Sequence, residues 1–320
     1  MAGDSSGYGV EVPAELVLSH AKFFGADGRT WIAALPRLAA DLVDRWALRR
    51  DGPPLCGAVA LILPVLRGDG TPAVLKLQPV DPETAGEQVA LRAWDGRAAV
   101  RLLRHDPDSG AMLLERRDAQ RTLAAVRPDL TALRLLTELS ARLNAVAAPP
   151  GIRRVSDVMA TVLDEVARTV DGVPDPAERR LLDTCAGAVT DVLPDAGGQL
   201  LHGDLHFDNV LGPAAGGHPG GRGDPWLAID PKPLAGDPGF DLLAALHNRW
   251  DEVVTTGDVP RAVRRRFDLM TEVLGLDRRR AAAWTLGRVL QGLLWEIEHR
   301  DTMWSSGPDR SVARALLTNL

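Results

Sequence analysis

The chain of 320 residues is 45% hydrophobic and 25% charged, and its formal net charge is −6. This length and composition allow two units that each bury a core. The acidic balance argues against nucleic acid or an anionic membrane surface as a partner and suits a cationic small molecule better. The sequence has no run of about eighteen apolar residues, and its N-terminus lacks a positively charged segment followed by an apolar one. We therefore expect a cytoplasmic protein.

Lysine and cysteine are rare in this sequence. Only three of the 37 basic residues are lysines, namely Lys22, Lys76 and Lys232. Because arginine supplies nearly all of the basic residues, each of these three lysines is a candidate for a specific role. Cys56 and Cys185 form no CxxC pair, and we interpret them as reduced, small side chains without a catalytic role.

The first part of the chain is predicted to be rich in strands. Residues 1–30 begin Gly/Ser-rich and are expected to be partly flexible. Apolar residues at helical spacing predict a helix over 31–49. Two β-rich runs, 58–66 and 73–77, flank a Gly-Asp-Gly turn and predict an antiparallel hairpin. A helix over 83–94 and short strands near 100–103 and 111–114 complete this part.

The second part is predicted to be mainly helical. Helical periodicity covers 130–146, 155–170 and 176–192, and it returns from 240 to the C-terminus. A Gly/Pro-rich loop over 212–225 and a short strand over 226–229 interrupt the helices. We therefore place a domain boundary at residue 117, with a sheet-bearing domain over 1–117 and a helical domain over 118–320.

The segment 201–211, Leu-His-Gly-Asp-Leu-His-Phe-Asp-Asn-Val-Leu, is a polar loop between apolar ends. It sets Asp204 and Asn209 five residues apart. Phosphoryl transfer needs a carboxylate that orients or deprotonates the attacking hydroxyl and an oxygen ligand for magnesium on the nucleotide phosphates. The spacing of Asp204 and Asn209 is typical of a kinase catalytic loop.

Lys76 and Glu87 are a second candidate pair. Lys76 lies within the apolar strand 73–77, where an unpaired ammonium would be costly. Glu87, on the next predicted helix, can orient the amine toward nucleotide phosphates. The alternative is that Lys76 extends to solvent from an edge strand and Glu87 is a solvated helix residue.

Asp230 ends the predicted strand 226–229 and is followed by Pro231. A carboxylate there, beside a loop that already offers an amide oxygen, suits magnesium bound through few protein groups. In isolation, Ile-Asp-Pro is also an ordinary strand-to-turn junction in which Asp is a turn former.

These motifs together resemble the aminoglycoside phosphotransferase branch of the protein-kinase-like superfamily, through His202-Gly203-Asp204 with Asn209 and Ile229-Asp230-Pro231. The segments 74–77, 87–94, 113–116 and 229–241 are similar to the streptomycin 6-kinase and hydroxyurea phosphotransferase family. The matching segments span 31–304. The resemblance implies an α+β, bilobal protein-kinase-like fold with a small antiparallel-sheet lobe, one key helix and a larger helical lobe.

The resemblance also implies roles for the chemistry-bearing residues. Asp204 would be the catalytic aspartate, and Asn209 and Asp230 would be ligands of Mg²⁺. Lys76, paired with Glu87, would contact the α- and β-phosphates of ATP.

The nucleotide-binding segments are implied less directly. The hinge between the lobes would begin with Glu115, Arg116 and Arg117, whose backbone groups would bind the adenine edge. No glycine triplet precedes Lys76, and Gly57 is the only candidate for a glycine that covers the phosphates.

The implied reaction is ATP-dependent phosphorylation of a small-molecule hydroxyl, foremost the 6-hydroxyl of streptomycin, which inactivates the antibiotic. The acceptor would be a cationic aminoglycoside and the enzyme a monomer. Candidate acceptor residues are His206, Asp237, Trp295, Glu298 and Asp301. The last three combine acids with tryptophan near a helix end, as a wall for a guanidinium sugar would; a solvated helix face explains them equally well. Asp241 is interpreted as a first-turn helix residue that interacts with the helix dipole.

Three alternatives stay open. The acceptor could be hydroxyurea or another metabolite, or the chain could bind nucleotide without transferring a phosphoryl group. His202, Asp204 and His206 could instead hold a transition metal in a hydrolase. That third alternative leaves Asn209, Asp230, Lys76 and Glu87 without roles, and we expect His202 to steady the loop by bonding to the backbone.

Overall fold

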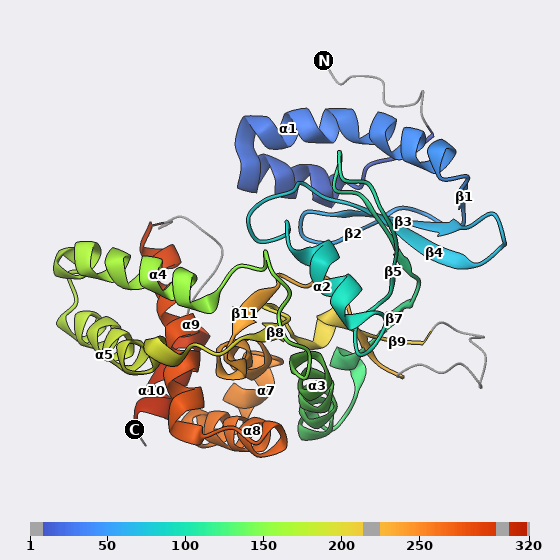
Figure 1. The fold of residues 1–320 in the computed structure, drawn as a ribbon. Coiled ribbons are helices and arrows are strands. Elements are labelled where there is room, and N and C mark those ends of the chain that lie inside the picture. The colour runs from blue at the N-terminus through green and yellow to red at the C-terminus, as the bar shows by residue number, and fades with distance from the viewer. Residues whose placement is uncertain (1–8, 214–224, 299–306, 319–320) are drawn as a thin grey trace. The chain divides into compact units, whose positions relative to one another are not determined.

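A computed structural model describes residues 9–213, 225–298 and 307–318 of the chain (Figure 1). The chain divides into two compact units, one of residues 1–96 and 100–117 and one of residues 97–99 and 118–320. Residues 97–99 join the second unit because the N–H of Ala228 donates to the carbonyl of Ala98 at 2.8 Å and Ala99 bridges to Ala228. None of the helices described is long and apolar enough to cross a membrane.

The first unit contains an antiparallel sheet of six strands. Its order is β1-β3-β4-β6-β5, with β2 also paired to β3. The strands are β1 (Arg49–Arg50), β2 (Leu55–Cys56), β3 (Leu61–Leu66), β4 (Pro72–Leu77), β5 (Leu102–His105) and β6 (Met112–Glu115). The predicted hairpin is β3 and β4, and its turn closes with the N–H of Arg67 donating to the carbonyl of Thr71 at 3.0 Å.

Helix α1 (Ala14–Arg45) packs against this sheet. Leu35, Leu42 and Trp46 share a core with alternate residues of β3 and β4, which is the pattern of a strand with one face turned to a helix. The helix starts well before residue 31, where it was predicted, and contains a break at Gly25, whose φ is 55°. That glycine takes a backbone conformation that other residues adopt at a cost.

The second helix of the unit, α2 (Glu87–Trp94), begins later than the predicted start at 83. Asp81 accepts hydrogen bonds from the N–H groups of Glu83 and Thr84, each at 2.8 Å. This side-chain turn satisfies the backbone before the helix and delays its start.

The second unit is built from helices, as predicted. They are α3 (Asp129–Asn144), α4 (Val155–Thr169), α5 (Pro176–Val192), α6 (Leu242–Leu246), α7 (Trp250–Thr255), α8 (Val259–Leu274), α9 (Arg278–Glu298) and α10 (Gly307–Leu317). Helix α9 is central, because Trp284, Leu286 and Leu290 on it are fully buried. It packs against α5, α10 and α4.

The second unit also contains five short strands, of which the sequence analysis predicted only β10, as the strand over 226–229. They are β7 (Asp118–Thr122), β8 (Gln199–Leu201), β9 (Val210–Gly212), β10 (Leu227–Ala228) and β11 (Leu234–Gly236). Strand β9 pairs with β7 and β10, and β8 pairs with β11. The segments 202–209 and 229–233 therefore run between the same two pairs of strands, which tie both loops together at each end.

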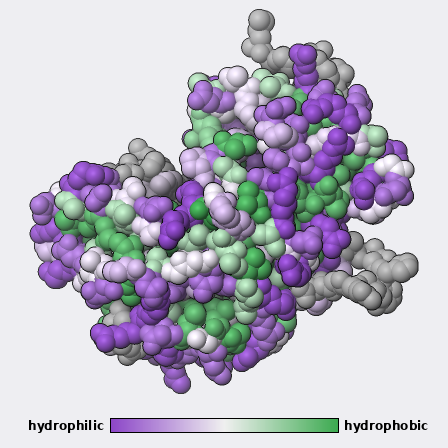
Figure 2. All heavy atoms as spheres, in the orientation of Figure 1, coloured by the Kyte–Doolittle hydropathy of each residue, from purple (hydrophilic) through white to green (hydrophobic). Residues whose placement is uncertain are grey.

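Polar residues are spread over the surface of both units, with hydrophobic residues between them (Figure 2). The exposed large hydrophobic side chains include Leu18, Phe23 and Trp295. Most of the predicted Gly/Pro-rich loop over 212–225 lies outside the described residues.

Candidate active site

Lys76 and Glu87 form a buried ion pair in the first unit. Lys76 is 3% exposed on β4, and Glu87 is 1% exposed as the first residue of α2. The Nζ of Lys76 donates to both carboxylate oxygens of Glu87, at 2.7 and 2.8 Å. The structure thus brings this predicted pair together, and it excludes the alternative in which both side chains reach solvent.

Gln78 is a third member of this cluster that the sequence analysis missed. Its Nε2 donates to the Oε2 of Glu87 at 2.6 Å, and the residue is 5% exposed. Gln78 and Lys76 are two positions apart, so the period of a strand turns them to the same face. That spacing was a signal in the sequence that could have identified Gln78.

Gly57 opens the turn between β2 and β3, where its N–H donates to the carbonyl of Ala60 at 3.0 Å. Helix α1 holds this turn: Ser19 Oγ donates to the carbonyl of Ala58, and His20 Nε2 lies 2.9 Å from the carbonyl of Val59. The position of Gly57 is therefore fixed without a glycine triplet.

The residues predicted to bind adenine lie at the end of the first unit. Glu115 ends β6, and its backbone N–H donates to the carbonyl of Arg101 at 2.9 Å. The side chains of Arg116 and Arg117 form ion pairs with Asp51, at 2.6 Å, and with Glu115, at 3.5 Å. These ion pairs hold both arginine side chains to other residues of the first unit. That the backbone of residues 115–117 binds the adenine edge stays a prediction.

In the second unit, Asp241 anchors the loop over 202–209. It ends the short helix η6 (Pro238–Asp241) and accepts hydrogen bonds at 2.9 Å from the N–H groups of both His202 and Gly203. Burial raises the pKa of Asp241 to about 6, against the lowering effect of these hydrogen bonds and of Arg288. Asp241 thus binds the loop directly, and its interpretation as a helix-dipole residue was incomplete.

His202 steadies the loop from inside, as predicted. The N–H of Asp204 donates to its Nδ1 at 3.3 Å, and its Nε2 lies 3.0 Å from the carbonyl of Ile229. The proton of the neutral ring therefore sits on Nε2 and is donated to Ile229. Burial lowers the pKa of His202 to about 4, although Asp204 and Asp230 oppose this shift.

Gly203 lets the two loops approach each other closely. Its φ is 79°, and a Cβ at this position would lie 1.9 Å from the carbonyl oxygen of Lys232. The N–H of Lys232 donates to the carbonyl of His202 at 2.9 Å. A side chain at residue 203 would therefore separate the loop that carries Asp204 from the one that carries Asp230.

The carboxylate of Asp204 lies partly open to solvent, with 26% of its side chain exposed. The Nζ of Lys232 is 3.3 Å from its Oδ2, and the Nε2 of His206 is 4.0 Å from its Oδ1. A carboxylate that is reachable and backed by a rigid loop can orient a hydroxyl and take its proton. The contact with Lys232 was not predicted.

Asn209 and Asp230 have the donor atoms that magnesium prefers. Asn209 ends η5 (Phe207–Asn209), and its Nδ2 donates to the backbone carbonyl of Asp204 at 2.9 Å, which turns the amide nitrogen inward and leaves Oδ1 for a ligand. The N–H of Ile229, next to Asp230, donates to the carbonyl of Asn209 at 2.9 Å. An amide oxygen and a carboxylate on adjoining segments fit a hard cation that keeps most of its ligands as water and phosphate.

Of the acceptor residues named from the sequence, the structure describes the side chains of His206, Asp237 and Trp295, each on a different segment of the second unit. Asp237 caps η6 by accepting from the N–H of Gly239 at 2.8 Å, and its other oxygen accepts from the Nε of Arg280 at 2.6 Å, so both of its carboxylate oxygens have partners within the protein. His206 is beside Asp204, whereas Trp295 lies 37% exposed on α9. The side chain of Glu298 and the whole of Asp301 lie outside the described residues.

The alternative metal site of His202, Asp204 and His206 is not formed. Both ring nitrogens of His202 are occupied by backbone groups. Across residues 9–213, 225–298 and 307–318, no group of three His, Cys, Asp or Glu side chains is placed to hold a metal ion.

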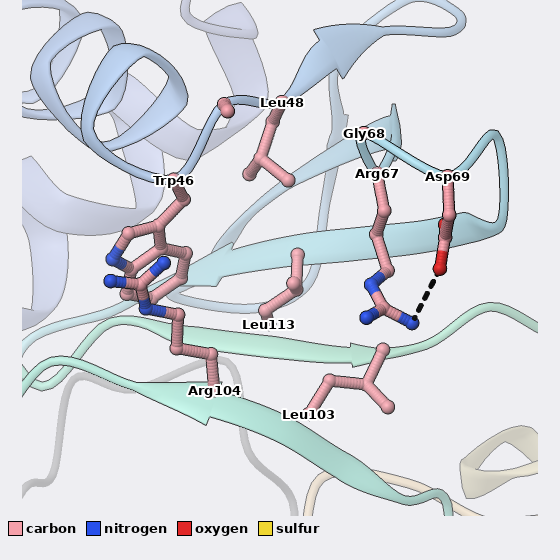
Figure 3. Close-up of a pocket in the computed structure, with 9 residues that line it drawn as sticks. Trp46, Leu48, Arg67, Gly68, Asp69, Leu103, Arg104 and Leu113 are labelled. Carbon is pink, nitrogen blue, oxygen red and sulfur yellow. Dashed lines mark ion pairs between the residues drawn. The ribbon is translucent and has the colours of Figure 1, made fainter.

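A separate hollow in the first unit contains none of the predicted site residues (Figure 3). Its volume is about 410 Å³, and Trp46, Arg67, Arg104 and Leu113 contribute to its lining. The guanidinium of Arg104 lies over the ring of Trp46 at 5.0 Å, and Arg67 forms an ion pair with Asp69 at 3.5 Å. Arg67 and Arg104 therefore already interact with other side chains of the protein.

A Lys–Glu pair between strand and helix, together with an Asp…Asn loop and an adjoining Asp, defines the class of kinase-like phosphotransferases. The fold agrees: the crystal structure of a thermostable mutant of the aminoglycoside phosphotransferase APH(4)-Ia, in a ternary complex with ADP and hygromycin B, is similar with a TM-score of 0.56. The two chains are 14% identical, and the similarity covers 86% of this chain and 97% of that one. The predicted fold class is confirmed.

Within that class, the chain belongs to the family of aminoglycoside/hydroxyurea antibiotic resistance kinases, whose model matches residues 45–299. A streptomycin 6-kinase from Streptomyces glaucescens is 54% identical over 90% of this chain and 92% of its own length. A hydroxyurea phosphotransferase from Kitasatospora aureofaciens is 49% identical over 96% of this chain and 85% of its own. The resemblance stated from the sequence is confirmed.

Proposed function

We propose that the protein transfers the γ-phosphoryl group of ATP to the 6-hydroxyl of streptomycin and so inactivates the antibiotic. The observation that carries the proposal is the Asp204 loop, held by Asp241 and His202 and tied by paired strands to the loop of Asp230. Identity above one half with a streptomycin 6-kinase supports this acceptor.

In the proposed mechanism, Asp204 aligns the acceptor hydroxyl and takes its proton as the oxygen bonds to the γ-phosphorus and the bond to ADP breaks. Lys76, oriented by Glu87 and Gln78, holds nucleotide phosphates. Asn209 and Asp230 would bind Mg²⁺, which neutralises charge on the phosphates when bound. Alignment and charge neutralisation supply most of the rate enhancement in this type of reaction.

Two further assignments belong to this proposal. The backbone of Glu115, Arg116 and Arg117 binds the adenine edge, and the turn that starts at Gly57 covers the phosphates. His206, beside Asp204, and the exposed Trp295 are the acceptor residues that we retain.

The test is to incubate the purified protein with magnesium–ATP and streptomycin and to measure one added phosphoryl group by mass spectrometry. Asp204→Asn should lower the turnover by roughly 10²- to 10⁴-fold with little loss of nucleotide affinity, as expected for a positioned acid–base group. The matched control is Asp208→Asn, which removes a carboxylate that is 70% exposed in the same loop. Equal turnover of Asp204→Asn and wild type would remove Asp204 from the mechanism.

Hydroxyurea is the second candidate acceptor, because a hydroxyurea phosphotransferase is nearly as similar as the streptomycin kinase. The two acceptors are compared by kcat/KM on the same preparation. A higher kcat/KM for hydroxyurea would reassign the acceptor and leave the assigned roles of the transfer residues unchanged.

A further inference from the structure

The backbone of Lys232 is fixed by the contact between the loops 202–209 and 229–233. Its backbone N–H donates to the carbonyl of His202, and its carbonyl occupies the space that a Cβ on Gly203 would fill. Strands β10 and β11 enclose the segment in which it lies. The Cα–Cβ end of the Lys232 side chain is therefore held in place together with the loop 202–209.

The side chain of Lys232, by contrast, is partly open to solvent. Its side chain is 38% exposed, and the Nζ is 3.3 Å from the Oδ2 of Asp204, which is itself 26% exposed. Ion pairs at this degree of exposure contribute about 0–1 kcal/mol to stability, because water screens them. A phosphate carries more negative charge than a carboxylate and can recruit the ammonium without a large cost.

Lys232 also differs in its surroundings from Lys76. Lys76 is 3% exposed and binds both oxygens of Glu87, so it has a fixed partner. Lys232 reaches the one carboxylate to which the proposed reaction assigns the acceptor hydroxyl. In the proposed reaction the phosphoryl group is transferred to that hydroxyl, so a cation beside Asp204 would be near the group in transfer.

We propose that Lys232 is a catalytic residue whose ammonium bridges Asp204 and the phosphoryl group in transfer. The inference rests on the proposed phosphoryl transfer and adds a cation that the family resemblance did not assign. The ammonium stabilises negative charge on the equatorial oxygens and keeps the phosphoryl group close to the hydroxyl that Asp204 holds. It stays protonated throughout, and the proton of the hydroxyl goes to Asp204.

The first test compares Lys232→Met with the matched control Lys22→Met, which removes the same charge from an exposed position on α1. Loss of one positioned group that stabilises the transition state should lower kcat by roughly 10²- to 10³-fold. The KM for ATP should change by less than about threefold, because the ground state is bound elsewhere. The thermal midpoint of both variants should match that of wild type; a low kcat accompanied by a lowered midpoint would mark Lys232 as a structural residue.

The second test restores the charge chemically. Lys232→Cys is treated with 2-bromoethylamine, which rebuilds an ammonium on a thioether of nearly the same length, and in parallel with iodoacetamide, which adds a neutral group. Wild type treated in the same way accounts for reaction at Cys56 and Cys185. Recovery of kcat with the first reagent alone supports the proposal, and equal recovery with both overturns the role of the charge.

The third test needs no acceptor and separates this inference from the proposed function. The affinities of wild type and Lys232→Met are measured for magnesium–ADP with and without aluminium fluoride, which mimics the phosphoryl group in transfer. We expect similar affinity for ADP, and an affinity for the aluminium fluoride complex that is lower in the variant by roughly 10²-fold. If no acceptor in the panel is phosphorylated, the proposed function fails while this measurement still decides the role of Lys232. Equal affinity of both proteins for the aluminium fluoride complex overturns it.

Discussion

His202 and Asp241 fix the backbone of Asp204 through groups that are buried and titratable. His202 accepts from the N–H of Asp204, and Asp241 accepts from two other N–H groups of the loop. Burial disfavours the charged form of both, so the pKa of His202 falls to about 4 and the pKa of Asp241 rises to about 6. The loop therefore depends on a neutral imidazole and is sensitive to the protonation of a carboxyl group.

The pKa shift of His202 predicts how its replacement depends on pH. The ring stays neutral in the folded protein down to about pH 4, whereas it takes up a proton near 6.5 when unfolded. Its contribution to stability is thus complete above pH 6.5 and is lost as the pH falls toward 4. The destabilisation caused by His202→Gln should shrink by up to about 3 kcal/mol between pH 7 and pH 4, measured by denaturant unfolding.

The effect of Asp241 on stability has the opposite dependence on pH over much of the interval between pH 4 and pH 6.5. Its folded pKa of about 6 exceeds the ordinary 3.8, so its effect on stability becomes less favourable as the pH rises from 3.8 to 6. The wild-type protein should therefore show a shallow dependence of unfolding free energy on pH where the two effects overlap. A difference between wild type and His202→Gln that stays constant from pH 7 to pH 4 would contradict the burial of a neutral ring.

At the scale of elements, strand β4 and helix α2 are joined by the Lys76–Glu87 pair. Glu87→Ala would remove the carboxylate to which the buried ammonium of Lys76 donates at 2.7 and 2.8 Å. We expect a loss of about 3–5 kcal/mol in the unfolding free energy, as for other broken buried pairs. The measurement is chemical denaturation, with Glu83→Ala, an exposed carboxylate before the same helix, as the control.

The double variant Lys76→Met/Glu87→Leu separates stability from function. Replacing both charges by apolar groups of similar size should recover most of the stability that Glu87→Ala loses. It should not recover nucleotide affinity, because the phosphates lose their cation. If the double variant binds ATP as wild type does, Lys76 is a structural residue.

The elements also differ in how well they could be predicted. Helices α3, α4 and α5 agree with the prediction to within two residues, because long apolar periodicity specifies them locally. Strands β8 to β11 have two or three residues each and were missed, apart from the short strand over 226–229. A strand of two or three residues is too short to show a hydrophobic periodicity in the sequence. It forms only because it pairs with another strand.

At the scale of the whole molecule, the net charge of −6 gives a test of the acceptor. A negative field attracts a cationic aminoglycoside and has little effect on uncharged hydroxyurea. Raising NaCl from about 0.05 to 0.5 M shortens the Debye length to a few ångströms and should increase the KM for streptomycin severalfold. The KM for hydroxyurea should stay constant; a parallel rise for both acceptors would point to a general effect of salt on the enzyme.

The sequence by itself predicted the family, the fold class and the candidate site residues Lys76, Glu87, Asp204, Asn209 and Asp230. Each of these stands out locally: a lysine in an apolar strand, a carboxylate and an amide at fixed spacing, an acid at a strand end. The comparison with known proteins confirms the family, and the structure confirms the Lys76–Glu87 contact.

Only the tertiary structure decided what surrounds Asp204. Asp241 reaches the loop across 38 and 39 positions of sequence, and Lys232 comes to Asp204 through the pairing of β8 with β11 and β9 with β10. These contacts depend on strands too short to be seen in the sequence and on Gly203, which permits the close approach of two backbones. Local sequence patterns identify the groups that can react, whereas the pairing of strands that are distant in the sequence determines which charged side chains lie beside those groups.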